Sequence, residues 1–320
     1  MSYRSLPLRL YELTHYSFRR EQSGEISGLK RLRCFTMPDL HTLCADMDQA
    51  TEEFKYQFQT SLRWMTNLNL GYEVALRFVK EYYEKNKRFA QDLAQLAGKP
   101  ILIELWDERY FYFVIKFEFN IIDSMKKASA LSTVQIDVEN AEQFDITFMD
   151  QNGEKRYPLI LHTSISGSID RCLYALLERE AIKMQQGGKP MLPVWLSPTQ
   201  IRFIPVKDEF LPDCEHFVDE LQQVSPYYCI RSDIDDREES VSRKIRDAEK
   251  EWVPIIVVVG EKEKRSKKMA PRFRSESIGK SAKLYSIKEL HKLVLNHVKD
   301  FPQEPLPLPV YLSKRPKFKG

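Results

Sequence analysis

The alternation of apolar and polar residues predicts that the chain opens with strands and then turns helical. Residues 6–17 show a mixed alternation typical of a strand, and residues 30–36 resemble a second strand beyond a polar loop, which predicts an antiparallel pair. Apolar residues then recur at three- and four-residue steps, which predicts two helices, at residues 39–68 and 71–96. This order of elements favours a domain that combines a sheet with helices.

Strand-like runs return after residue 100 and lead into one more helix. They cover residues 101–106, 110–122, 132–138, 143–149 and 159–165. Asn152-Gly153, between the last two runs, predicts a tight hairpin turn. Small residues at 166–168 then precede a helix that runs to about residue 186. We expect an α+β domain over residues 1–186, in which helices flank an antiparallel sheet.

The pattern changes after a short linker at residues 187–192, where Gly-Gly and then Pro break any helix. Strands and helices alternate beyond the linker, which predicts a small α/β domain over residues 193–301. Its strands are expected at 201–206, 227–232, 254–260 and near 269–274, and its helices at 211–224, 238–250 and 286–299. The Pro-rich basic tail, residues 302–320, is expected to be extended or poorly ordered.

Composition limits the class of protein. The chain has 320 residues, of which 42% are hydrophobic and 30% charged, as in a globular protein of two domains. No apolar run approaches the roughly 20 residues that span a membrane, and the first residues lack the apolar core of a signal peptide. We therefore expect a cytoplasmic location and no membrane partner. Five scattered cysteines argue against a disulfide framework. The net charge of +3 permits basic patches such as residues 262–281, although that stretch can also be a solvated charged loop.

Three short patterns indicate little chemistry by themselves. Arg19 and Glu21 form an R-x-E pair that suits phosphate and adenine, but such pairs are more often surface ion pairs. His41-x-x-Cys44 has a spacing that metal sites use, yet at the start of a predicted helix it more often has no function. Residues 187–189, Gly-Gly-Lys, are not a P-loop, because the preceding glycine and the following Ser or Thr are missing.

Two longer strings narrow the interpretation. Residues 17–44, SFRREQSGEISGLKRLRCFTMPDLHTLC, resemble the second signature motif of the class II aminoacyl-tRNA synthetases. Their form, R-x-E, then G-L-x-R-x-R-x-F-T, then D-x-H, resembles the threonyl-tRNA synthetases. Residues 159–178, LILHTSISGSIDRCLYALLE, resemble the third motif, which is a strand, a small-residue turn and a helix. Between them, residues 113–121 and 132–138 also look like family segments. The chain is thus similar to an archaeal-type threonyl-tRNA synthetase without its front part.

The resemblance implies an ATP site that is used with magnesium. Its residues would be Arg19, Glu21, Arg31, Phe35, Gln135 and Arg171. Arg19 would bind the α-phosphate and stabilise charge in the transition state, and Glu21 would accept the adenine amino group. Arg31 would hold the γ-phosphate, and Phe35 would stack on adenine. Arg171 would clamp the nucleotide from the other face, so that Arg19 and Arg171 are the expected catalytic pair.

The resemblance also implies a way to select threonine. Asp39 would bond the side-chain hydroxyl of threonine, and Gln135 would line the pocket between threonine and ATP. His41 and His162 would be two of three protein ligands to a zinc ion. An apolar pocket separates threonine from the nearly isosteric valine only about a hundredfold. A metal with an open position can coordinate the amino group and the hydroxyl together, which valine does not offer.

The second domain resembles the anticodon-binding domain of the threonyl, prolyl, histidyl and glycyl enzymes, which reads bases by hydrogen bonds and stacking. The likeness lies in residues 195–206, 235–249 and 253–263. The expected anticodon-reading residues are Glu263, Arg272 and Arg274. Candidates for contacts with backbone phosphates are Arg237, Lys244 and Arg246. Ordinary surface charges explain each of these residues about equally well.

Two functions stay open. The first is a threonine–tRNA ligase that makes threonyl-adenylate from threonine and ATP and transfers threonine to the 3′ end of tRNA(Thr), as a homodimer in the full-length protein. The second is a truncated, non-catalytic paralogue that binds tRNA through its C-terminal domain. The sequence shows neither the first class II motif nor the upstream cysteine that would give the third zinc ligand. It also shows no domain for editing mischarged serine, so the activity of this chain alone stays open.

Overall fold

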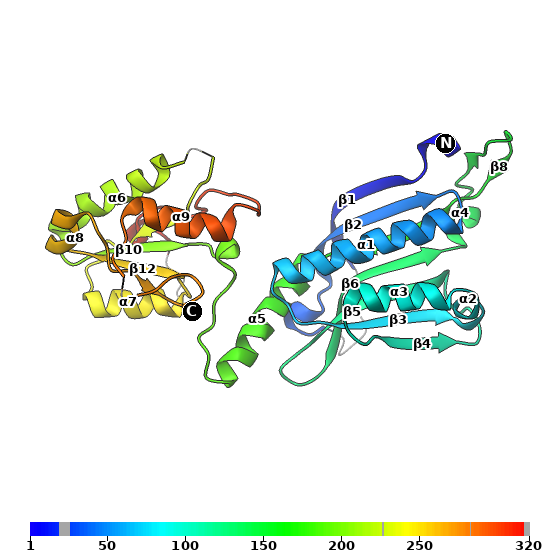
Figure 1. The fold of residues 1–320 in the computed structure, drawn as a ribbon, viewed down its shortest axis with the longest axis horizontal. Coiled ribbons are helices and arrows are strands. Elements are labelled where there is room, and N and C mark those ends of the chain that lie inside the picture. Colours follow the sequence, from blue (N-terminus) through cyan, green and yellow to red (C-terminus); the bar gives the residue numbers. More distant parts are fainter. Residues whose placement is uncertain (19–25, 226, 282, 317–320) are drawn as a thin grey trace. The chain divides into compact units, whose positions relative to one another are not determined.

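The computed structural model describes residues 1–18, 26–225, 227–281 and 283–316. The chain divides into two compact units, Met1–Ile182 and Lys183–Gly320 (Figure 1). Within the described ranges, no helix combines the length and the apolar character that crossing a bilayer requires.

A seven-stranded sheet forms the centre of the described part of the first unit, in the order β1-β2-β9-β6-β5-β3-β4. Neighbouring strands are antiparallel except β3 and β4, which are parallel. The strands are β1 (Leu8–Ser17), β2 (Cys34–Cys44), β3 (Glu73–Val79), β4 (Leu102–Trp106), β5 (Phe113–Ile122), β6 (Ala128–Asp137) and β9 (Leu159–Ser164). A separate hairpin of β7 (Phe148–Met149) and β8 (Lys155–Arg156) contains the predicted Asn-Gly turn, with Gly153 at φ +78°. The predicted antiparallel sheet with helices is confirmed.

Helices α1 and α3 pack on one face of this sheet (Figure 1). The N-terminus of α1 is capped by Asp46, whose carboxylate accepts a hydrogen bond from the Gln49 backbone N–H at 2.8 Å. Phe54 and Phe58 of α1 meet Phe117 of β5 edge-on, with ring centroids 5.4 and 4.9 Å apart, and all three are fully buried. Short 3₁₀ turns and helices of this unit are η1 (Tyr3–Ser5), η2 (Gly28–Lys30), α1 (Met47–Asn67), α2 (Lys80–Lys85), α3 (Lys87–Ala97), α4 (Asn140–Gln143) and α5 (Ile169–Gln185).

Three elements in this unit differ most from the sequence prediction. The helix predicted at 39–68 begins only at Met47, because the preceding residues continue β2 between two partner strands. The helix predicted at 71–96 is wrong at its start, since residues 73–79 alternate between buried and less buried and pair with both β4 and β5. The strand predicted at 143–149 is reduced to two residues, since Asp137 accepts the Glu139 and Asn140 N–H groups where α4 begins.

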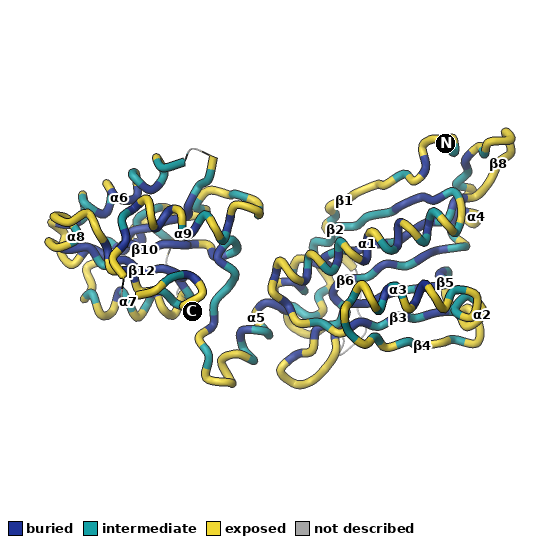
Figure 2. The backbone as a smooth tube through the Cα atoms, viewed as in Figure 1, coloured by how far each residue is buried: buried dark blue, intermediate teal, exposed yellow. Residues whose placement is uncertain are grey.

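The second unit contains a four-stranded sheet in its described residues, ordered β11-β10-β12-β13. Its first three strands are parallel and β13 is antiparallel. The strands are β10 (Ile201–Pro205), β11 (Ser232–Ile234), β12 (Ile255–Val259) and β13 (Arg272–Phe273). The helices and 3₁₀ turns are η3 (Val194–Leu196), η4 (Asp208–Phe210), α6 (Leu211–Gln223), α7 (Val241–Lys250), α8 (Glu261–Ser266), α9 (Ile287–Val298) and η5 (Leu312–Lys314). The strand predicted at 227–232 thus lies later in the chain, and α8 was not predicted. Figure 2 shows β10 and β12 buried among the helices.

Where it is described, up to residue 316, the tail contacts the rest of the second unit. Its backbone runs beside β11, where the Ile234 N–H donates to the Val310 carbonyl at 2.9 Å. The Tyr311 hydroxyl donates to Glu215 at 2.5 Å. Arg315 forms an ion pair with the buried Asp233 at 2.9 Å. These polar contacts fix a Pro-rich segment that has no core of its own.

Candidate functional site

A basic cavity of about 240 Å³ lies in the first unit, between the first strand pair and the start of α5. Its lining includes Lys30, Arg31, Phe35, Thr133, Gly167 and Arg171. Three residues predicted for ATP, from two motifs far apart in sequence, therefore lie around one cavity. The predicted residues Arg19 and Glu21 fall outside the described part of the chain.

Arg171 is held in place by neutral partners. Its Nε donates to the Lys30 carbonyl and its Nη1 to the Ala130 carbonyl, each at 3.0 Å. Burial, and then the nearby Arg31 guanidinium, lower the pKa of Arg171. Two guanidinium groups that repel each other across a small cavity favour an anion between them, and planar guanidinium donors suit phosphate oxygens.

The turn before α5 positions this arginine. Gly167 has φ +67°, and a Cβ atom there would lie 2.3 Å from the Leu131 carbonyl oxygen. Only glycine permits this conformation and this close approach. Ser168 then accepts a hydrogen bond from the Arg171 N–H at 3.2 Å, at the start of the helix. The small residues seen in the sequence thus allow α5 to begin against β6.

One face of β2 continues from this cavity toward the middle of the sheet. Side chains two residues apart point to the same side of a strand, so Phe35, Met37, Asp39 and His41 share this face. Phe35 packs against Tyr16, with ring centroids 5.7 Å apart. The Tyr16 hydroxyl donates to the Asp39 carboxylate, and this hydrogen bond raises the pKa of Tyr16 to about 12. Asp39 is therefore held by a neutral phenol that stays a donor at physiological pH.

The two predicted histidines are direct neighbours. His41 of β2 lies opposite His162 of β9, and their ring centroids are 5.0 Å apart at an interplanar angle of 88°. Gln135 of β6 lies opposite His162 on its other side. The Tyr112 hydroxyl donates to Gln135 Oε1 at 2.8 Å. Register across three strands therefore places both imidazoles and the predicted amide in one row.

The surroundings of His41 favour its neutral imidazole. Burial, and then the neighbouring His162, lower the pKa of His41. His162 Nε2 lies 2.6 Å from Oδ2 of Asp137, which is fully buried. Burial alone would raise the pKa of Asp137, but hydrogen bonds from His162 and from the Asn140 and Glu139 N–H groups outweigh it and lower that pKa. A carboxylate behind an imidazole fixes the ring and its tautomer, as it commonly does behind metal-bound histidines.

The histidine pair meets part of what a zinc site requires. Neutral imidazole is a good zinc ligand, and the two rings lie beside a mostly apolar cavity of about 490 Å³. In the described ranges, however, no three His, Cys, Asp or Glu side chains gather closely enough to hold a metal ion. The alternative pair of His41 and Cys44 is excluded, because three residues along a strand place them on opposite faces. Cys44 is fully buried, and burial raises the pKa of its thiol to about 12.

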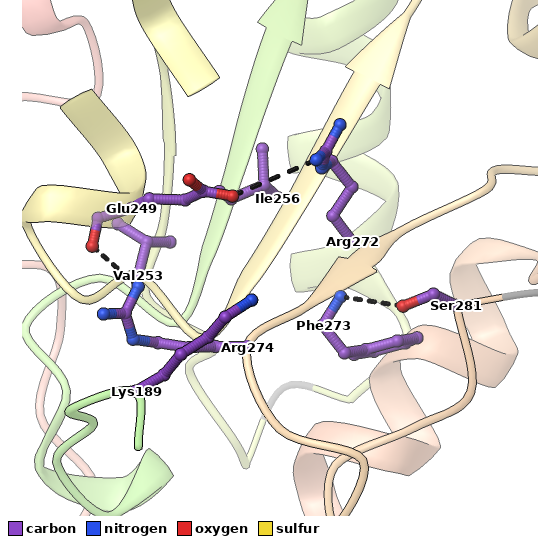
Figure 3. A pocket seen from close by; sticks show the side chains of 8 residues that line it. All are labelled: Lys189, Glu249, Val253, Ile256, Arg272, Phe273, Arg274 and Ser281. Atoms are coloured by element: carbon purple, nitrogen blue, oxygen red, sulfur yellow. Dashed lines mark hydrogen bonds and ion pairs between the residues drawn. The ribbon is translucent and has the colours of Figure 1, made fainter. Parts of the chain in front are cut away.

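The second unit has its own basic cavity, of about 450 Å³, which contains two of the predicted anticodon residues (Figure 3). Arg272 lies 4.0 Å from the Glu249 carboxylate across the cavity. Arg274 donates to the Glu249 carbonyl at 2.6 Å and to the Pro190 carbonyl. Lys189, Phe273 and Ser281 are among the other lining residues. Charge, an aromatic ring and a hydroxyl are thus available to a ligand.

The other residues predicted for this unit have structural partners. The Glu263 carboxylate accepts the Gly260 N–H at 3.1 Å and caps α8, and Glu263 is not among the residues that line the cavity. Lys244 is buried, so its predicted phosphate contact is wrong for this structure. Arg237 is paired with Asp235 at 2.7 Å, whereas Arg246 is exposed.

Sequence reasoning missed three residues of the first unit's site, Tyr16, Tyr112 and Asp137. Asp137 follows Gln135 by two residues on a predicted strand, so strand periodicity could have placed both side chains on the same face. Tyr16 and Tyr112 gave no such signal, because their partners Asp39 and Gln135 lie on other strands.

Comparisons with known proteins show which family each domain belongs to. Residues 1–180 match the family model "tRNA synthetase class II core domain (G, H, P, S and T)", and residues 200–297 match "Anticodon binding domain". The chain is 53% identical to the threonine–tRNA ligase of Pyrococcus horikoshii over 323 aligned residues, which cover 100% of this chain and 51% of that protein. It is 52% identical to that of Methanothrix thermoacetophila, covering 99% and 51%. The chain therefore spans about half the length of these curated relatives.

A solved structure supports the fold. The RNA-binding domain of threonyl-tRNA synthetase from Cryptosporidium parvum superposes with a TM-score of 0.73 and 24% identity, covering 94% of this chain and 73% of that one. Similarity at this level of identity concerns the fold alone.

Proposed function

The chain belongs to the class II aminoacyl-tRNA synthetases, and we propose that it is the catalytic and anticodon-binding part of a threonine–tRNA ligase. In the proposed reaction, the threonine carboxylate attacks the α-phosphorus of ATP to give threonyl-adenylate and pyrophosphate, and the threonyl group is then transferred to the 3′ end of tRNA(Thr) with release of AMP. One observation carries the proposal. The basic cavity with Arg31, Phe35 and Arg171 and the row of Gln135, His162 and His41 meet on one face of the sheet.

ATP with its magnesium would occupy the basic cavity. Phe35 would stack on adenine, and Arg31 and Arg171 would bind phosphate oxygens from two sides. Because Arg171 is already fixed by two carbonyls, its charge needs little reorganisation as negative charge develops on the phosphates. By the family resemblance, Arg19 would bind the α-phosphate and Glu21 the adenine amino group.

Threonine would bind beside this cavity, farther along β2. Asp39, held by Tyr16, would accept a hydrogen bond from the threonine hydroxyl, and Gln135, held by Tyr112, would line the pocket. His41 and His162 would hold zinc together with a third ligand from outside the described residues. Such an ion would supply an open position that takes the amino group and the hydroxyl together. Asp137 would keep the His162 ring in its orientation.

The cavity of the second unit would read the tRNA anticodon. Arg272 and Arg274 are suited to base edges and phosphates, and Phe273 to stacking. Glu263 is assigned to the same function from the family resemblance. We further propose that the full-length protein is a cytoplasmic homodimer.

A substrate test addresses the proposal directly. The chain is joined to the remaining half of a threonine–tRNA ligase, and ATP–pyrophosphate exchange is measured with threonine, valine and serine. We expect exchange with threonine, with valine lower by more than about a hundredfold. Asp39→Asn should lower kcat/KM for threonine about a hundredfold, because a charged hydrogen bond is lost. Asp48→Asn, at an exposed position on α1, is the matched control.

The second candidate function is a non-catalytic, tRNA-binding paralogue. It is favoured by the incomplete metal-ligand set among the described residues. The joined protein distinguishes the two. If it binds tRNA(Thr) but shows no threonine-dependent exchange, the ligase assignment fails and the paralogue stands.

A further inference from the structure

A cysteine and a histidine on the first strand pair lie within hydrogen-bond distance of each other. Cys34 Sγ is 2.9 Å from Nε2 of His15, and His15 Nδ1 is 3.1 Å from Oγ1 of Thr36. His15 lies opposite Thr36 in the antiparallel register, and Cys34 precedes Thr36 by two residues. The three side chains therefore share one face, the face of β2 that points away from Phe35 and Asp39.

This arrangement has the parts that an activated thiol requires. A nucleophile is activated when a base lies within hydrogen-bond reach and a third group orients the base. When His15 Nδ1–H donates to Thr36 Oγ1, Nε2 is the atom that accepts the thiol proton. Thr36 is itself fixed from α5, since its N–H donates to Asp170 at 3.2 Å.

Access separates Cys34 from the other cysteines. Cys34 and His15 are exposed, so that small reagents can reach both. The buried cysteines are Cys44, Cys172 and Cys214. Burial raises the pKa of these three thiols to between about 11 and about 12. Cys229 is half-buried, and no histidine hydrogen bond to it is found among the described residues. Cys229 is therefore a comparison thiol inside the same molecule.

We propose that Cys34 and His15 form a reactive thiol–imidazole pair that hydroperoxides oxidise to a sulfenic acid. The Cys34 thiol transfers its proton to His15 Nε2, and the thiolate attacks the outer peroxide oxygen. The S–O bond forms as the O–O bond breaks, and the leaving alkoxide or hydroxide takes the proton back from the imidazolium. One thiol and one hydroperoxide thus give one sulfenic acid and one alcohol or water.

The test treats the full 320-residue chain with hydrogen peroxide, traps sulfenic acid with dimedone and quantifies each cysteine by peptide mass spectrometry. We expect Cys34 to be trapped at least about tenfold faster than Cys229, and His15→Gln to remove most of that difference, because glutamine cannot take the proton. His216→Gln, in the other unit, is the control and should change nothing. Equal rates for Cys34 and Cys229, or an unchanged rate in the His15→Gln chain, would overturn the proposal.

A second measurement needs no variant. Iodoacetamide alkylation of Cys34 is compared in the native chain and in the same chain unfolded in urea. The pair exists only in the folded protein, so the native rate should exceed the unfolded rate although folding usually slows such reactions. A native rate at or below the unfolded rate would reject the pair.

Discussion

The carboxylates that pair with the cationic side chains lie in different places in the two basic cavities. In the first unit, Lys30 lines the cavity, but its partner Asp123 is not among the lining residues and lies 3.1 Å away from the lysine. The Arg171 guanidinium donates to two backbone carbonyls. In the second unit, Glu249 lines the cavity itself, 4.0 Å from Arg272.

This difference indicates different ligands. A cavity lined by Lys30 and two arginines, with the carboxylate partner of Lys30 outside the lining, presents several cationic donors, which suits the concentrated charge of a triphosphate. A cavity that holds both signs offers donors and acceptors together, which suits the edges of nucleobases more than phosphates. Removing one arginine from each cavity in turn tests whether the two cavities bind different ligands.

The largest effect is expected from Arg171→Ala. ATP affinity of the 320-residue chain, measured by calorimetry, should fall about a hundredfold, since a charged clamp worth about 3 kcal/mol is lost. Arg171→Lys should recover only part of this, because an ammonium cannot reproduce a planar fork. Arg63→Ala, at an exposed position on α1, is the control. Unchanged ATP affinity in the Arg171→Ala chain would mean that the basic cavity is not the nucleotide site.

A smaller effect is expected from Arg272→Ala in the other cavity. Affinity for tRNA(Thr) should fall about tenfold, and a tRNA with an altered anticodon should lose less, because a base-reading contact discriminates between sequences. Arg265→Ala removes an exposed arginine on α8 that pairs with Glu261 and serves as the control. An equal loss for both tRNAs would indicate a phosphate contact and would contradict the contrast between the cavities.

The first unit also shows what sequence could and could not predict. The strands of β5 and β9 followed from local apolar patterns and occur where expected. The strand β3 did not, because its alternation is embedded between helical stretches and is decided by pairing with β4 and β5. Local propensity gives way where tertiary pairing is strong.

The same limit applies to the site residues. The contact of His41 with His162 depends on the register of β2 against β9, which periodicity alone does not give. Only the resemblance of the two motifs brought these histidines together. In the second unit, Glu263 sits at the third position of a helix that the pattern did not show, so its capping function could not be foreseen.

The smallest effect is expected from Asp123, the carboxylate that pairs with Lys30 outside the first cavity. It tests the contrast between the two cavities further. Hydrogen bonds from the Lys127 N–H, then from Lys30 and Tyr174, overcome burial and lower the pKa of Asp123 to about 2, from an ordinary 3.8. A carboxyl whose pKa is depressed in the folded state adds stability that is complete above about pH 4 and is lost as the pH falls toward 2. Because Asp123 joins β5 to Lys30 and to Tyr174 of α5, that loss should loosen the wall of the cavity.

Hydrogen–deuterium exchange of α5 peptides should therefore rise between pH 4 and pH 2, after correction for the intrinsic exchange rate. In Asp123→Asn the rise should be smaller, since asparagine does not titrate, whereas exposed Asp300→Asn in the second unit should behave as the unmodified chain. Glu249 differs from Asp123, because it lines its own cavity. Its carboxylate is 4.0 Å from Arg272 and lines its cavity directly, so Glu249→Gln should change ligand binding there without loosening a helix elsewhere. If α5 exchange proves indifferent to pH in this window, Asp123 is not the support of the cavity.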